Sequence, residues 1–417
     1  MVATATIGTM IEWYDFFIYG FLATSLAAYY FPAADPVAQT LTAFMAFAIG
    51  LFFRPLGALL FGAMGDRIGR KATFMLAILL MGSATAAIGI LPGYAQIGTA
   101  ASVLVFLMRV IQGLSIGGAW GGAASLVAEY VPAEKRGYYD SWTTAAAPLA
   151  VVVANAVILL LNFGLGKEAM GAWGWRIPFI LSLVLVFISL YLRWKIEESP
   201  VFSGMKKAGT ISKAPLKEAF ASHGGLMLVG ALISIGLGAG WYSAYFATVN
   251  HIKLIGKADP VTAATIMMIA GAVSFVAYIL LGGVLVDKWG RKPVLILGYA
   301  LAAITWYPLY KLIPTGDPVK MGIAAVLLAT WTAMYYGPYG SLFPEMFPAK
   351  VRYTAMSVAY HFPVGIFGGI APYAMLWFTE KFNNPLAGVW FPVISVALSA
   401  ILGAIFLKET KKVDISK

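Results

Sequence analysis

The sequence predicts an all-α membrane protein with twelve transmembrane helices in two pseudo-symmetric six-helix bundles. Two observations lead to this fold class, the composition and an internal repeat. Hydrophobic residues make up 60% of the 417 residues and charged residues only 11%, which cannot cover a water-soluble protein. The apolar residues occur in runs of about 20, the length of helix that crosses the ~30 Å hydrocarbon core of a bilayer.

Glycine, proline and charged residues separate these apolar runs and place the helices in order. The first six lie near 6–30, 37–62, 72–92, 101–127, 142–162 and 176–195, and the second six near 225–247, 262–286, 293–313, 320–343, 354–378 and 388–407. The first run follows no basic stretch and contains two acidic residues, so we expect a retained helix and not a cleaved signal peptide. We expect an N-terminal bundle at 1–196, a linker at 197–222 and a C-terminal bundle at 223–417.

The internal repeat lies in the short loops. The segment Gly62-Ala-Met-Gly-Asp66-Arg-Ile-Gly-Arg70-Lys71 returns after the eighth helix as Gly283-Val-Leu-Val-Asp287-Lys-Trp-Gly-Arg291-Lys292. The segment from Glu129 to Arg136 returns as Glu345 to Arg352, at nearly the same spacing along the chain. Two loop types that repeat together indicate a duplicated bundle. Internal repeats around a site at the bilayer midplane are typical of secondary transporters.

The positive charges predict the orientation. Of the 29 Lys and Arg residues, twenty fall on the side that holds the linker and both chain ends, seven fall on the other side, and Arg54 and Arg109 lie inside helices. Cytoplasmic loops carry the excess of basic residues, so we expect both termini and the linker in the cytoplasm. Basic loops beside anionic lipid also explain the net charge of +11 without any nucleic-acid partner.

Several other classes of protein are disfavoured. The chain has no cysteine and only three scattered histidines, so we expect neither a metal site nor redox chemistry. No Gly-x-x-x-x-Gly-Lys-Ser/Thr loop is present, which disfavours an ATP-driven pump. No catalytic set appears at informative spacing, and we therefore do not expect an enzyme.

At these motifs the sequence resembles the major facilitator superfamily, whose signature is the loop Gly-x-x-x-Asp-Arg-x-Gly-Arg-Lys. More narrowly, it resembles the metabolite:proton symporter family over most of its length. The segments that carry this likeness are Ile11-Glu-Trp-Tyr-Asp15-Phe-Phe-Ile-Tyr-Gly20, Phe53-Arg54-Pro55-Leu-Gly57, Arg109-Val-Ile-Gln-Gly-Leu, Gly174-Trp-Arg-Ile-Pro-Phe179 and Glu-Glu-Ser-Pro-Val-Phe202.

The resemblance implies proton-coupled transport of a small organic solute across the inner membrane of a prokaryote. Members of the family carry organic acids such as citrate, or zwitterionic solutes such as proline and betaine. We expect an organic acid, no cofactor beyond the proton as coupling ion, and a monomer. A transporter of a zwitterionic compatible solute, an uncoupled facilitator, a sugar porter and a transporter-like receptor remain as alternatives.

Four ionisable residues inside the predicted helices need a partner or water, because a charge at mid-membrane is costly. Glu12 and Asp15 are three residues apart and share one face of a helix. At 1.5 Å per residue, Asp15 and Arg109 fall within roughly 5 Å of the same depth, near mid-membrane. Glu12 and Arg54 lie nearer the cytoplasmic side. Two acid and base pairs, Asp15 with Arg109 and Glu12 with Arg54, are therefore plausible.

We predict that Asp15, or alternatively Glu12, exchanges the coupling proton. Arg109 or Arg54 would then bind a substrate carboxylate or change partner when the acid is protonated. A carboxyl suits proton exchange because burial favours its neutral form and a nearby arginine favours its charged form. The structural alternative is that both pairs only hold the first, second and fourth helices together.

Aromatic residues and one histidine are further candidates for the substrate site. His361 lies in the eleventh helix and titrates near neutral pH when unperturbed. Tyr242 of the seventh helix and Tyr336 of the tenth, with their neighbours Trp241, Tyr245, Tyr335 and Tyr339, could supply hydroxyl donors to a cavity. Packing or an interfacial aromatic belt would give the same spacing.

Charged residues at the cytoplasmic helix ends form the last group of predicted functional residues. By resemblance they make the network that holds the two bundles together on the cytoplasmic side and breaks when the protein opens inward. The residues are Asp66, Arg70, Glu129, Arg136, Asp287, Arg291, Glu345 and Arg352. The alternative is that they only determine topology and cap helices.

Overall fold

The computed structural model describes residues 2–33, 35–68, 70–194, 203–204, 207, 214–411 and 413–415. The N-terminal half contains α1 (Val2–Phe21), α2 (Ala23–Tyr30), α3 (Pro36–Phe52), α4 (Arg54–Ile68), α5 (Arg70–Ile90), α6 (Tyr94–Ile97), α7 (Thr99–Tyr130), α8 (Arg136–Thr144), α9 (Ala146–Ala172) and α10 (Ile177–Trp194). These helices form six columns, because α1 continues into α2, α3 into α4 and α8 into α9. They confirm the first six predicted helices.

The C-terminal half repeats the arrangement with α12 (Pro215–Tyr242), α13 (Thr248–Leu254), α14 (Pro260–Ile279), α15 (Leu285–Trp289), α16 (Arg291–Tyr310), α17 (Pro318–Tyr336), α18 (Tyr339–Met346), α19 (Arg352–Lys381) and α20 (Trp390–Phe406). Two π-helical turns, η3 (Ser243–Ala247) and η4 (Leu280–Val284), join α12 to α13 and α14 to α15. The described part of the chain thus gives twelve columns in two six-helix bundles.

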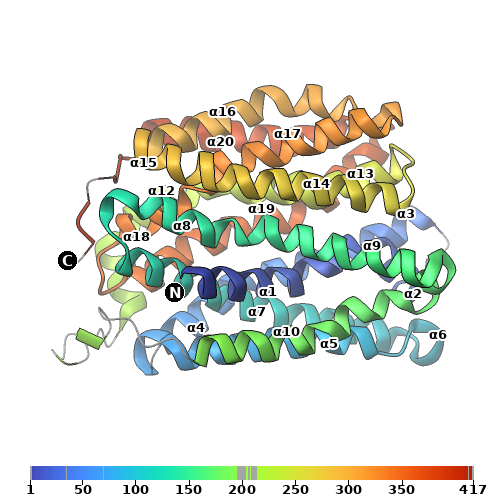
Figure 1. The fold of residues 1–417 in the computed structure, drawn as a ribbon, viewed down its shortest axis with the longest axis horizontal. Helices are drawn as coiled ribbons and strands as arrows, with labels where there is room; N and C mark the ends of the chain where they lie inside the picture. The colour runs from blue at the N-terminus through green and yellow to red at the C-terminus, as the bar shows by residue number, and fades with distance from the viewer. Residues whose placement is uncertain are drawn as a thin grey trace.

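The columns run side by side, with the C-terminal helices α14, α16, α17 and α20 in one layer and the N-terminal helices α4, α5, α7 and α10 in the other (Figure 1). Both chain ends lie toward the same end of the molecule, which we call the terminal end. Along the interface between the bundles α19 packs against α3 and α4, and α9 packs against α14.

Ten stretches of the described residues are long and apolar enough to cross a membrane, and Met75–Ile90 is a shorter apolar helix. The remaining column, α1 with α2, contains the acidic residues Glu12 and Asp15, which make it more polar. The seventh column begins at Pro215, earlier than the predicted residue 225, because Pro215 at the first helical position starts a polar helical turn. Most of the predicted linker 197–222 lies outside the described residues, so the division into domains stays a prediction.

Backbone contact brings the second and fourth columns close together. A side chain at Gly113 would collide with the carbonyl oxygen of Gly50, and one at Gly117 with the carbonyl of Arg54. Small residues at four-residue steps allow this approach. The contact fixes α4 against α7 and thereby places Arg54 at the boundary between the bundles.

Candidate functional site

Arg54 is a fully buried arginine that reaches across the boundary between the bundles. It begins α4 directly after Phe53, where the column is interrupted because Pro55 lacks a backbone N–H. Its Nη1 donates a 2.7 Å hydrogen bond to the hydroxyl of Tyr242 on α12. Its Nε and Nη2 have no hydrogen-bond partner among the described residues. A buried cation with two free donor nitrogens is suited to bind an anion, because charge-assisted bonds would satisfy both.

Aromatic rings surround this guanidinium from both bundles. Its central carbon lies 5.3 Å from the ring centre of Trp13 on α1 and 5.7 Å from that of Tyr360 on α19. A cavity of about 10 Å³ lies among these rings and is lined by Trp13, Ala147, Leu237, Trp241, Tyr242, Tyr336, Tyr360 and Val364. That volume holds about one water molecule. The central cavity is therefore closed around its residues in this conformation.

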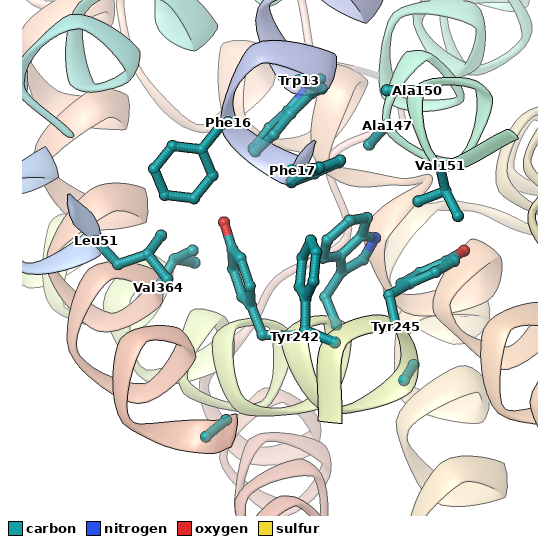
Figure 2. Packing of buried hydrophobic residues seen from close by; sticks show 14 of the residues in the cluster. Trp13, Phe16, Phe17, Leu51, Ala147, Ala150, Val151, Tyr242, Tyr245 and Val364 are labelled. Carbon is teal, nitrogen blue, oxygen red and sulfur yellow. The ribbon is translucent and has the colours of Figure 1, made fainter. Parts of the chain in front are cut away.

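Figure 2 shows how the two bundles meet at this cavity: Trp13, Phe16 and Phe17 of α1 point toward Tyr242 and Tyr245, which lie on α12 and η3. Leu51 and Val364 lie to one side of Tyr242. The π-helical turn η3 follows directly after Tyr242. Such turns often occur at functional sites because they redirect side chains within a helix.

His361 and Tyr336 belong to the same group of residues. His361 is fully buried, and neither ring nitrogen has a hydrogen-bond partner. Its ring centre lies 4.9 Å from that of Tyr360 and 6.3 Å from that of Trp120. Tyr360 donates a 3.3 Å hydrogen bond to the hydroxyl of Tyr336. The structure thus brings four predicted substrate residues, Arg54, Tyr242, Tyr336 and His361, to one place.

Arg109 is a second fully buried arginine, but it lies within the N-terminal bundle. Its guanidinium carbon is 4.2 Å from the ring centre of Phe16 and 4.5 Å from that of Tyr19. It donates a 2.6 Å hydrogen bond to Gln112, which in turn donates one of 2.7 Å to Thr85. These contacts compensate a buried cation through aromatic faces and hydrogen bonds instead of an ion pair.

The predicted pair of Asp15 with Arg109 is wrong for this conformation. Asp15 is only 2% exposed, and its Oδ1 has no hydrogen-bond partner. Its Oδ2 lies beside α5, 3.3 Å from where a side chain would begin at Gly82. Neighbouring residues on a helix point about 100° apart, so α1 directs Phe16 toward Arg109 and Asp15 toward α5. Depth alone did not reveal this rotation.

The predicted pair of Glu12 with Arg54 is also absent from the contacts of Arg54, which binds Tyr242 instead. Glu12 is buried, with 8% of its surface exposed. The side chain that α1 turns toward Arg54 is the next residue, Trp13. The same helical rotation therefore separates both expected partners.

Ionic contacts close the terminal end between the bundles. Glu345 on α18 accepts a 2.9 Å bond from Arg136 of the other bundle and a 2.8 Å bond from Arg291 of its own. Arg352 of α19 donates a 2.8 Å bond to Glu129 of α7. We call Glu129, Arg136, Asp287, Arg291, Glu345 and Arg352 the charged latch. The side chains of Asp66 and Arg70, also predicted here, lie outside the described residues.

Asp287 contributes to this closure by capping a helix of the other bundle. Its two carboxylate oxygens accept 2.8 Å hydrogen bonds from the backbone N–H groups of Gly137 and Tyr138, at the start of α8. The helix dipole favours a negative charge there. A side chain at Gly137 would begin 2.5 Å from Asp287 Oδ1, so this contact requires glycine. Part of the latch is therefore a cap supplied in trans.

Aromatic contacts close the path on the other side of the central cavity. Phe17 stacks on Trp241 with ring centres 4.9 Å apart, and Phe246 lies 5.1 Å from Phe17 and 4.9 Å from Phe21. We call Phe17, Phe21, Trp241 and Phe246 the aromatic plug. With the latch and the plug both formed, the central cavity is occluded from both ends.

Beyond the plug lies a larger cavity of about 210 Å³, which we call the vestibule. It is lined by Phe21, Leu22, Thr24, Ser25, Asn155, Ile158, Asn162, Lys167, Met170, Gly171, Val249, Lys253, Pro260 and Ala264. Lys253 donates a 3.1 Å hydrogen bond to the carbonyl oxygen of Phe21. Of the described residues that line this space, two are lysines and none is acidic, so the vestibule favours anions.

Some residues of the site were missed from the sequence. Trp13 and Tyr360 each neighbour a predicted residue in sequence, and Trp120 lies on α7, three residues after Gly117. Trp13 directly follows Glu12 and Tyr360 directly precedes His361, and this adjacency could have indicated both residues from the sequence. Gln112 lies three residues after Arg109, a spacing that places both on one helix face, and this could have indicated their bond.

Comparisons with known proteins agree with this architecture. The profile of the family described as "Sugar (and other) transporter" matches residues 1–222 and, separately, 204–417. The inner membrane metabolite transport protein YhjE of Escherichia coli (strain K12) is 36% identical, over 96% of this chain and 93% of that protein. The citrate-proton symporter of Salmonella typhi is 30% identical over 98% of this chain and 94% of that protein.

The name of another relative indicates a different class of solute. The glycine betaine/proline/ectoine/pipecolic acid transporter OusA of Dickeya dadantii (strain 3937) is 31% identical, over 98% of this chain and 83% of that protein. Among solved structures, the partially occluded inward-open xylose transporter XylE from E. coli matches with a TM-score of 0.80 at 19% identity, covering 99% of this chain and 98% of that one. That likeness shows the fold.

Two six-helix bundles around an occluded cavity define a multi-pass membrane transporter. The chain belongs to the sugar (and other) transporter family and hence to the major facilitator superfamily, as the loop motifs predicted. It is a transporter of small solutes and not an enzyme.

Proposed function

We propose that this transporter is a proton-coupled symporter that carries a small organic acid by alternating access. The observation that carries the proposal is Arg54, a fully buried cation at the bundle boundary with two unpartnered nitrogens. A solute carboxylate would accept bonds from both of them. The name of the citrate-proton symporter relative supports this solute class.

The residues around Arg54 would complete recognition of the acid. Tyr360 contacts both Tyr336, through a 3.3 Å hydrogen bond, and the ring of His361, and the hydroxyls of Tyr242 and Tyr336 and the ring nitrogens of His361 are the groups that we propose for a second polar group of the solute. Because the central cavity has a volume of only about 10 Å³, the bundles must move apart before a solute fits. Binding between the bundles is what lets a solute couple their motion.

Asp15 is the proposed proton carrier, with Glu12 as the alternative. A buried carboxyl whose oxygen lacks a partner is stable only when neutral, and it releases its proton once water reaches it. Thr85 donates a 3.4 Å hydrogen bond to the backbone oxygen of Asp15, so the hydrogen-bond chain of Arg109 and Gln112 leads to the same turn of α1. Arg109 then acts on proton binding by positioning this turn.

The charged latch and the aromatic plug are the proposed alternating barriers. The terminal end carries the latch and most of the basic loop residues, so we assign it to the cytoplasm and assign the membrane to the inner membrane of a bacterium. The vestibule then opens toward the outside, where Lys253 and Lys167 would attract an anionic solute. We expect one chain to suffice, since the cavities lie within it.

A zwitterionic compatible solute is the second candidate, favoured by a specific observation. Five aromatic residues line the central cavity beside Arg54: Trp13, Trp241, Tyr242, Tyr336 and Tyr360. Aromatic faces bind quaternary ammonium groups through cation–π interactions, while Arg54 would bind the carboxylate. The name of the relative OusA agrees with such a solute.

The deciding experiment is uptake by the purified protein in liposomes. Labelled citrate, 2-oxoglutarate, shikimate, proline, betaine and glucose are tested with and without an inward proton gradient. We expect the gradient to drive accumulation of one acid, and we expect Asp15→Asn to abolish accumulation while leaving exchange of internal for external solute intact.

The outcomes separate the candidates. Gradient-driven accumulation of betaine or proline alone would replace the acid with the second candidate. If the solute only equilibrates across the membrane and the proton gradient has no effect, the protein is a facilitator and Asp15 has a structural role. Substitution of Glu168 by Gln, an exposed residue on the outer side, is the control for a nonspecific loss of charge.

A further inference from the structure

Asp140 is a buried carboxyl that the transport mechanism above does not use. It lies on α8 and is fully buried, and within the part of the chain that the structure describes neither carboxylate oxygen has a hydrogen-bond partner. It faces α18 of the other bundle, where a side chain at Gly340 would begin 2.9 Å from its Cβ. Asp140 therefore lies at the bundle boundary, beside the charged latch, and separation of the bundles would expose it to cytoplasmic water.

The charges around Asp140 are balanced without it. The charged groups that act on it are Glu345 of α18, Arg136 of α8, Arg291 of α16 and Asp287 of α15. Arg136 and Arg291 contact the carboxylates of Glu345 and Asp287, so two cations meet two anions.

Among the described residues, no charged side chain on the other elements packed against α8 hydrogen-bonds to Asp140. The helix α14 and the turn η4 carry no Asp, Glu, Lys, Arg or His. On α7, Glu129 pairs with Arg352 and Arg109 donates to Gln112. On α1 the carboxyl of Asp15 lies beside α5, and Glu12 is a second acid that brings no positive charge. Lys288 of α15 and Lys135 directly before α8 are exposed to solvent. An ionised Asp140 would be a third negative charge in a buried site with two cations, and an uncompensated buried charge is strongly unfavourable.

We propose that Asp140 is a proton-binding site of the transport cycle: it holds a proton while the charged latch is closed and releases it to cytoplasmic water when the latch opens. In the release the carboxyl O–H bond breaks, the proton passes to water, and the carboxylate is left hydrated. Closing the latch takes the proton back. This inference rests on the proposed alternating access but does not require that Asp15 carries the coupling proton.

The sign of the resulting pH dependence follows from proton linkage. The closed state binds one proton more than the open state, so raising the pH favours opening. One proton changes the ratio of open to closed by up to tenfold per pH unit. Above the pH at which the hydrated carboxyl ionises, low cytoplasmic pH therefore favours the closed latch.

The absence of cysteine in the chain allows a direct test. Ser125 is buried between α7 and α19, where it meets Met356, and Ser125→Cys would be reached by a membrane-impermeant maleimide from the cytoplasmic side only when the bundles separate. Labelling rates are measured between about pH 5 and 8 in inside-out vesicles of the full chain. Comparison at equal pH with the same reporter in Asp140→Asn removes the pH dependence of the thiol itself.

We expect the ratio of two labelling rates, that of the reporter with Asp140 to that of the reporter with Asp140→Asn, to rise by up to tenfold per pH unit. Glu134→Gln, an exposed carboxylate on the neighbouring loop, should behave as the unsubstituted protein. Equal pH dependence with and without Asp140 overturns the proposal, and Asp140→Ser repeats the comparison if the asparagine variant does not fold.

Two further results keep this proposal separate from the proposed function. If neither Asp140 variant folds, the Ser125→Cys reporter with Asp140 in place decides the matter alone. A labelling rate that rises with pH only as much as the ionisation of its thiol predicts would overturn the proposal. If liposomes show no proton-driven accumulation but the labelling still depends on Asp140, the symporter proposal fails and the proton-binding latch stands.

Discussion

Substitution of Arg54 tests the substrate site most directly. Arg54 offers two unpartnered nitrogens, and a hydrogen bond to a charged group contributes about 1.5–3 kcal/mol. Loss of both in Arg54→Gln would cost roughly 3–6 kcal/mol, or at least about a hundredfold in affinity at 1.4 kcal/mol per tenfold. Arg54→Lys keeps the charge but not the fork of donors, so we expect a loss of about tenfold to a hundredfold.

The assay is binding of the accumulated solute to detergent-purified protein, followed by counterflow in liposomes. Tyr242→Phe is the matched variant, because it removes the hydroxyl that accepts the 2.7 Å hydrogen bond from Arg54 Nη1 and leaves the guanidinium in place. We expect Tyr242→Phe to change affinity by less than Arg54→Lys. Equal affinity of Arg54→Lys and the unsubstituted protein would refute the idea that the guanidinium of Arg54 binds the solute.

Three other predictions address the latch, the vestibule and the C-terminal segment. Gly137→Ala should displace Asp287 from the start of α8 and raise labelling of Ser125→Cys about 5–30-fold, the equivalent of 1–2 kcal/mol; unchanged labelling would remove the trans cap from the latch. Lys253→Gln should raise KM for an anionic solute several-fold at low salt, and the difference should shrink in about 0.5 M salt if it is electrostatic; a lower kcat with unchanged KM would argue against docking in the vestibule. Partial burial alone would raise the pKa of Glu409, but backbone N–H donors, including those of Arg291 and Lys411, hold that pKa below its usual value. The ionised carboxylate of Glu409 therefore stabilises the fold fully above the usual pKa of a glutamate. This stabilisation is lost as the pH falls through the lowered pKa of Glu409. Glu409→Gln should therefore lower Tm by about 2 °C at pH 7, and this difference should shrink as the pH falls below the usual pKa of a glutamate. A difference that stays the same throughout the acidic range would contradict this reasoning.

The topology could be predicted because it depends on patterns that the bilayer imposes. Apolar run length places every column. The loop motifs, through the family resemblance, indicated which charged residues gather at the terminal end, and the ones that the structure describes there do contact one another, while their role in gating stays a prediction. Glu345 and Arg136 come from different repeats, and their bond of 2.9 Å is the kind of contact that duplication predicts.

The partners of the buried charges could not be predicted from depth. A shift of one position along α1 exchanges Asp15 for Phe16 or Glu12 for Trp13, and only packing fixes which side chain meets an arginine. Asp140 was not singled out because a carboxylate near a cytoplasmic loop looks solvated in sequence. Its burial depends on α18, which lies about two hundred residues further along the chain.

The two barriers of this protein differ in their chemistry, and solution conditions should therefore act on them differently. The aromatic plug involves no charge, so dissolved ions affect it mainly through hydrophobic burial, which excluded salts strengthen. Opening the latch exposes charged groups, and their free energy in water falls as ions accumulate around them. Concentrated salt on the side of the latch should thus shift the same transporter toward the form in which the latch is open and the plug is closed.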